Sequence, residues 1–185
     1  MHSTKTLTMK KLFRPYLTAF LLGALLISTS SCGDDDDPDP IKEEENITSM
    51  TLTLEPVATD KGIQTATATF TAGSKPTLSL VPNTQYNATI TFNDKIEDEI
   101  RTEAEDHELF FDAPENVLVV QKILPDDFDN NDRPVGLQTR MLSGNTGSTG
   151  SLKITLKHQP GLKTDESDVT IGETDIEATF TVNVQ

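Results

Sequence analysis

Residues 86–92 read Tyr-Asn-Ala-Thr-Ile-Thr-Phe, and this stretch decides the fold class. Apolar side chains alternate with Asn or Thr, so one face of the segment is apolar and the other is polar. Successive side chains of a β-strand point to opposite faces of the sheet, which gives this period of two. The alternation recurs in Met50–Leu54, Ala66–Phe70, Leu152–Leu156 and Ile176–Val184. The pattern predicts half-buried antiparallel strands.

Turn-forming residues separate these segments, for example Pro82-Asn83 and the stretch 143–150 (SGNTGSTG). Val117–Leu124 and Val135–Leu142 are two further strand candidates. Seven or eight short strands with turns between them predict a mainly β fold, an immunoglobulin-like antiparallel β-sandwich. We place this domain at residues 47–185.

One segment has a different period. In residues 94–107 (DKIEDEIRTEAEDH), Ile96, Ile100 and Ala104 recur every four positions, which is the spacing of one helix face. The spacing predicts one short helix over about 94–107, packed across one end of the sandwich.

The N-terminal 31 residues have the pattern of a secretory signal peptide. They carry four basic and no acidic side chains, and the apolar stretch Tyr16–Ile27 is followed by Ser and Thr up to Cys32. The apolar stretch is shorter than the ~20 residues of a membrane-spanning helix. Cys32 is the only cysteine, so it has no partner for an internal disulfide. We expect its lipidation, which anchors the mature chain to a membrane.

Acidic residues dominate the chain after the signal segment. Residues 33–46 (GDDDDPDPIKEEEN) are charged and contain proline, so with Cys32 they form an acidic tether, residues 32–46. Without residues 1–31 the chain has 11 basic and 30 acidic residues, a net charge of −19. Nucleic acids require clustered Lys and Arg, so we expect no nucleic-acid partner.

Three residues are candidates for a metal site. On the predicted helix, Glu103 and His107 share the apolar face one turn apart, and His158 continues the inward series of its strand. Buried carboxylate and imidazole groups require partners. If the helix caps the strand that carries His158, the three groups converge. Two interpretations stay open: a site for Zn²⁺ or another divalent ion, and a hydrogen-bonded His–carboxylate network that only holds the helix in place.

A second cluster, Asp127, Asp129 and Asn131, alternates as the first ligands of a calcium-binding loop do. Asp132 occupies the position where such loops have glycine, and Gln138 the position of the closing glutamate. The candidates are therefore a Ca²⁺ site and a polar turn between two strands.

The sequence Cys32-Gly33 followed by Asp34, Asp35, Asp36 and Asp37 resembles the start of Bacteroidota-type surface lipoproteins. In that class the acidic run after the lipidated cysteine marks export to the outer leaflet. The resemblance implies an outer-membrane lipoprotein that is exposed at the cell surface.

Four stretches resemble a family of small flavobacterial-type lipoproteins of unknown function: EAEDHELFF (103–111), DNNDRPVGL (129–137), SLKITLKHQPGLK (151–163) and GETDIEATFTVNVQ (172–185). The resemblance implies an accessory role beside a TonB-dependent outer-membrane receptor. Some members are labelled as having a type 1 periplasmic binding fold, but the period of two argues against an α/β domain here.

These observations favour a non-enzymatic binding module at the cell surface, an accessory to the uptake of a ligand or metal. No serine lies in a nucleophile-elbow context, so a hydrolase is a remote option. The alternative is a structural or adhesive surface lipoprotein with no small-molecule ligand.

Overall fold

The computed structural model describes residues 47–58, 62–93 and 96–185, which all belong to the unit Glu44–Gln185. The predicted signal peptide, Cys32, the run Asp34–Asp37 and the acidic tether lie outside the described residues. Within the described ranges, no helix has the length and apolar character needed to cross a membrane.

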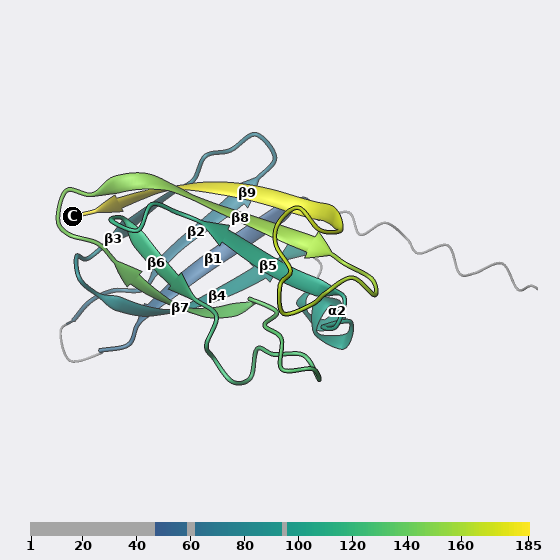
Figure 1. Ribbon diagram of the computed structural model, residues 1–185. Coiled ribbons are helices and arrows are strands. Elements are labelled where there is room, and N and C mark those ends of the chain that lie inside the picture. The colour runs from purple at the N-terminus through teal and green to yellow at the C-terminus, as the bar shows by residue number, and fades with distance from the viewer. Residues whose placement is uncertain (1–46, 59–61, 94–95) are drawn as a thin grey trace, which may run out of the picture. The chain divides into compact units, whose positions relative to one another are not determined.

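Two β-sheets form the domain, with the element order visible in Figure 1. The five-stranded sheet has the order β2-β1-β4-β7-β6, with β1 at Ser49–Pro56, β2 at Ala66–Thr71, β4 at Gln85–Phe92, β6 at Leu118–Gln121 and β7 at Gln138–Ser143. The four-stranded sheet has the order β3-β9-β8-β5, with β3 at Thr77–Leu80, β5 at His107–Asp112, β8 at Thr149–His158 and β9 at Glu173–Val184. The predicted β-sandwich is confirmed, with nine strands in the described part instead of seven or eight.

The sandwich forms because the apolar faces of the alternating strands bury against each other. In β4 every second residue is buried, as the sequence YNATITF predicted. In β1, Met50, Leu52 and Leu54 have no exposed surface, and Phe180 and Val182 of β9 are equally buried. Burial of each such side chain stabilises the fold by roughly 1.5–3 kcal/mol. The hydrophobic core thus explains why Thr lies outward and Leu inward.

The helix is much shorter than the predicted 94–107. Helix α2 spans Glu97–Thr102, and its buried residue is Ile100. Beyond it, the carbonyl groups of Ala104, Asp106 and His107 accept hydrogen bonds from the segment 159–163 instead of continuing the helix. These contacts join residues about 55 apart in sequence, so a local period could not reveal them.

The strands β3 and β5 were not predicted. β5 begins at His107 and has the sequence HELFFD, in which neither polarity nor burial alternates, so a period of two gave no signal for it. β3 has only four residues and lies parallel to β9, whereas all the other paired strands are antiparallel.

One end of the sandwich gathers α2 and the first residues of β1, β5 and β9 (Figure 1). The backbone N–H groups of Thr48 and Ser49 donate to Asn93 Oδ1, which follows the end of β4. The C-terminus lies at the opposite end of the sandwich (Figure 1), where Val184 pairs with Leu80 of β3. We call the end with α2 the entry end, because the described chain begins there at Ile47.

Candidate functional site

The two histidines of the described residues meet at the entry end of the four-stranded sheet. His107 is the first residue of β5, His158 is the last of β8, and the two are directly opposed in the strand pairing. Their imidazole rings stack with centroids 4.6 Å apart and planes 5° from parallel. The prediction that His107 lies on a helix face was wrong, because antiparallel pairing of β5 with β8 positions it instead.

The predicted convergence with Glu103 is confirmed. One potential ligand atom from each of Glu103, His107 and His158 lies within 4.8 Å of the others. His107 is buried, and the other two residues are half-buried. Glu103 reaches the pair from the turn that follows α2, so the cluster joins three elements: this turn, β5 and β8.

The ring of His107 is held in one orientation. Its Nδ1 lies 3.1 Å from the backbone carbonyl oxygen of Glu103, and an N–H at Nδ1 donates to that oxygen. Burial lowers the pKa of His107, and the stacked His158 lowers it further, although the Glu103 carbonyl opposes the shift. The ring is therefore neutral at pH 7, with its lone pair on Nε2. A metal-ligating histidine is commonly held in this way, with its other ring nitrogen donating to a carbonyl or carboxylate.

Asp175 also belongs to this cluster, and the sequence did not reveal it. In the pairing of β8 with β9, Leu156 opposes Ile176 and Lys157 opposes Thr174, so Asp175 has no opposite residue. This extra residue forms a β-bulge, which redirects side chains from the regular alternation. Asp175 Oδ2 consequently lies 3.9 Å from His107 Nε2. The alternation of a regular strand gives no signal for such a position.

Two buried polar atoms of the cluster have no hydrogen-bond partner among the described residues: His158 Nε2 and Asp175 Oδ2. Burying a polar group without a partner costs about 1–3 kcal/mol, so such atoms are rare in native proteins. The acidic loop has two such atoms as well, Asp127 Oδ1 and Asp129 Oδ2, but Arg101 Nη1 and Lys163 Nζ lie 3.7 Å and 3.1 Å from them. The ion pairs of the described residues give the histidine cluster no Lys or Arg in the same position, so this cluster is the one open to a ligand with positive charge or donor character.

No match was found when the chain was compared with protein-family models, curated proteins and solved structures. The chemistry of the cluster therefore carries the functional conclusion.

Two features of the framework position the cluster. Gly172, just before β9, has φ +77°, and a Cβ there would lie 2.2 Å from the carbonyl oxygen of His158. Only glycine allows this approach of β9 to β8. Lys163 Nζ donates to the carbonyl oxygens of Ala104 (2.7 Å) and His107 (3.0 Å), which joins the turn to the first residue of β5.

The same lysine holds the acidic loop of the proposed calcium site. Lys163 Nζ lies 3.1 Å from Asp129 Oδ2, and neither side chain has exposed surface. Asp129 Oδ1 accepts hydrogen bonds from the N–H groups of Asn131 (2.8 Å) and Arg133 (2.9 Å). Burial raises the pKa of Asp129, but these two N–H groups and the ammonium of Lys163 together outweigh burial and hold the pKa below its usual value.

The carboxylate of Asp127 also has contacts within the domain. Its Oδ2 accepts a 2.7 Å hydrogen bond from the N–H of Gly136, and Arg101 Nη1 lies 3.7 Å from its Oδ1. Asn131 is exposed, and it contributes its backbone N–H to the turn. These contacts favour the polar-turn interpretation of the loop. Calcium binding by Asp127, Asp129 and Asn131 stays a prediction.

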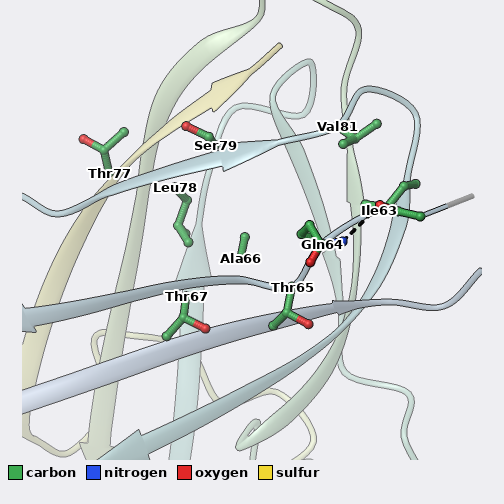
Figure 2. A pocket seen from close by; sticks show the side chains of 10 residues that line it. Ile63, Gln64, Thr65, Ala66, Thr67, Thr77, Leu78, Ser79 and Val81 are labelled. Carbon is green, nitrogen blue, oxygen red and sulfur yellow. Dashed lines mark hydrogen bonds between the residues drawn. The ribbon is translucent and has the colours of Figure 1, made fainter. Parts of the chain in front are cut away.

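A groove with a volume of about 720 Å³ lies away from the histidines, between the edge strands β2 and β3. It is lined by Gly62–Thr67, Thr77–Ser79 and Val81, none of which is titratable. Figure 2 shows the side chain of Leu78 directed toward Ala66 between the two strands. The residues that line the groove provide no acid, base or histidine, in contrast to the cluster at the entry end.

Proposed function

We propose that the protein is a lipid-anchored, surface-exposed binding module that captures a divalent transition-metal ion and catalyses no reaction. The ion binds at the cluster of Glu103, His107 and His158. The observation that carries this proposal is the convergence of their ligand atoms within 4.8 Å, with His158 Nε2 buried and without a partner.

The donor set determines the class of ion. Imidazole nitrogens suit Zn²⁺ and its first-row neighbours, whereas Ca²⁺ and Mg²⁺ prefer sites made of oxygen alone. The neutral ring of His107 is the form that binds a metal. The net charge of −19 in the mature chain also raises the local concentration of cations.

The competing interpretation, a closed His–carboxylate network, fits the geometry less well. His107 donates to the backbone carbonyl of Glu103 and not to a carboxylate. The 3.9 Å between His107 Nε2 and Asp175 Oδ2 exceeds a hydrogen bond.

Binding of one ion by both histidines requires a small rearrangement. The lone pairs of an imidazole lie in its ring plane, and the two planes are nearly parallel. Parallel lone pairs do not meet at a common point, so one ring must turn about its Cβ–Cγ bond. The half-buried His158, whose Nε2 has no partner to lose, is the ring that turns.

The position of the site fits delivery to a partner in the membrane. Cys32 is the proposed lipid anchor, and the 14 residues between it and the first described residue, Ile47, span at most about 50 Å when extended. The chain enters the domain at the end that carries the cluster. A TonB-dependent receptor in the outer membrane is the proposed partner for metal uptake.

The metal proposal is tested with the chain from residue 33 onward, which retains every residue of the hydrophobic core. The protein must be purified without a histidine tag, because the imidazoles of the tag would bind Zn²⁺ and obscure binding by the two histidines of the domain. Isothermal titration with Zn²⁺ is expected to show a single site. Loss of a residue that only supports a metal ligand typically lowers metal affinity about 10–100-fold. His158 is proposed as a direct ligand, so His158→Ala is expected to lower the Zn²⁺ affinity by more than that. Lys153→Met, which changes an exposed ion pair, is the control. Equal Zn²⁺ binding by wild type and His158→Ala would refute the site.

The location is tested in cells. Cys32→Ala is expected to release the protein from the membrane fraction. Replacement of Asp34–Asp37 by serines is expected to leave it in the membrane but to protect it from protease added to intact cells. Protection of the wild-type domain from that protease would contradict surface exposure.

A further inference from the structure

The bulge in β9 brings a second carboxylate to the histidines. Asp175 is the residue left without an opposite partner between Thr174 and Ile176, and its Oδ2 faces His107 Nε2 at 3.9 Å. We propose that Asp175 is the fourth ligand of the centre, so that the ion is held by two imidazole nitrogens and two carboxylate oxygens. This inference rests on the metal-binding function proposed above.

The separation of the two atoms suits a shared ion. Zn–N and Zn–O bonds of about 2.0–2.2 Å in a tetrahedral centre place neighbouring ligand atoms roughly 3.3 Å apart. His107 Nε2 and Asp175 Oδ2 need to approach by about 0.6 Å to reach this spacing. Asp175 lies outside the group of Glu103, His107 and His158 whose ligand atoms are within 4.8 Å of one another, so its side chain must also move toward the other two ligands when the ion binds. The distance is too long for a hydrogen bond and short enough for two ligands of one ion.

Among the described residues, no lysine or arginine forms an ion pair with Asp175. Lys157, its neighbour across the bulge, donates to Thr174 Oγ1 at 2.9 Å. In contrast, the buried Oδ2 of Asp129 has the ammonium of Lys163 at 3.1 Å. A bound divalent ion would supply the positive charge that this carboxylate lacks.

The four proposed ligand atoms, two imidazole nitrogens and two carboxylate oxygens, determine which metal ions the centre can bind well. The set contains no sulfur, which disfavours Cu(I), and its imidazoles disfavour Ca²⁺ and Mg²⁺. Zn²⁺ and Co²⁺ accept four ligands of this kind in a tetrahedral arrangement. The centre is therefore expected to select Zn²⁺-like ions over the alkaline-earth ions.

The test uses Asp175→Asn, which keeps the shape of the side chain and removes its charge. Glu177→Gln is the matched control, because Glu177 is an exposed carboxylate on the same strand and lies opposite Thr155, away from the histidines. Zn²⁺ affinity is measured by titration, and the visible absorption of the Co²⁺-loaded protein reports its coordination. Asp175→Asn is expected to lower Zn²⁺ affinity at least about tenfold and to change the Co²⁺ spectrum, while Glu177→Gln matches wild type.

The outcomes separate the two proposals. If wild type binds no Zn²⁺, the proposed function fails, and this inference fails with it. If wild type binds Zn²⁺ and Asp175→Asn has the same affinity and Co²⁺ spectrum, only the fourth ligand is refuted. Melting temperatures of both variants near that of wild type show that the domain is folded.

Discussion

Two buried polar clusters lie on opposite sides of the same residue, His107, and they differ in how their charges are satisfied. Its backbone carbonyl belongs to the Lys163 cluster, where Lys163 contacts three oxygens at 2.7–3.1 Å. Its side chain belongs to the histidine cluster, where His158 Nε2 and Asp175 Oδ2 are buried without a hydrogen-bond partner among the described residues. Asp129 Oδ2 of the first cluster also lacks a well-aligned hydrogen bond, but the ammonium of Lys163 lies 3.1 Å from it and compensates its charge. The histidine cluster instead has ligand atoms without a compensating cation in the described part of the chain. We therefore assign the Lys163 cluster to the stability of the fold and the histidine cluster to function.

The largest expected effect comes from breaking the Lys163 cluster. Lys163→Met leaves Asp129 as a buried, unpaired charge and removes the donor of the Ala104 and His107 carbonyls. Removal of one partner of a buried ion pair typically costs about 3–5 kcal/mol. We expect the free energy of unfolding, measured by urea denaturation, to fall by this amount.

The control is Lys153→Met, which removes an ion pair with Glu177 whose two side chains are about half exposed. Exposed pairs contribute only about 0–1 kcal/mol. If Lys163→Met and Lys153→Met lower the free energy of unfolding by the same small amount, the Lys163 cluster does not stabilise the fold as proposed.

A smaller effect follows from the depressed pKa of Asp129. Its ordinary pKa is 3.8, and the pKa is lower in the folded state. The carboxylate therefore adds stability that is fully present above pH 3.8 and is lost as the pH falls through the folded-state pKa. Urea unfolding of wild type between pH 5 and pH 2 is expected to show this loss, and Asp129→Asn should lack it.

Asp165→Asn is the control for acid unfolding, because the side chain of Asp165 is 85% exposed. A titration of the Asp129 carboxyl group followed by ¹³C NMR measures its folded-state pKa directly in the wild-type protein. A midpoint above 3.8 would contradict the sign of the shift.

The smallest effect is expected from calcium. Asp127 and Asp129 already accept hydrogen bonds from Gly136, Asn131 and Arg133, and Lys163 pairs with Asp129. Ca²⁺ must displace these contacts, so about 10 mM Ca²⁺, above the usual affinity range of extracellular sites, should leave the melting temperature unchanged. A clear rise would show that the loop is a calcium site.

The sequence was sufficient for the sandwich because a half-buried strand repeats every two residues. This periodicity is local, and it predicted β1, β4 and β9 directly. It was insufficient for α2, because the carbonyls that end the helical region are bonded by Lys163 and Gln159 from a distant loop. Long-range contacts of this kind leave no period in the sequence.

The candidate site was predictable in part for the same reason. His158 continued an inward series, and His107 stood out as a polar residue on an apolar face, so their meeting with Glu103 was correctly anticipated. The reason given for His107 was wrong, since strand pairing brings the rings together. Asp175 was missed because a bulge interrupts the alternation of β9 only in the folded protein.

The most direct test of the account is an NMR measurement of the imidazole ¹⁵N shifts as Zn²⁺ is added to the chain from residue 33 onward. That chain has only two histidines, so both rings are resolved without mutation. The account predicts that His107 Nε2 and a ring nitrogen of His158 shift together and that the shifts are complete at one equivalent of Zn²⁺. Imidazole shifts that stay unchanged past one equivalent would contradict it and would favour a purely structural role for the cluster.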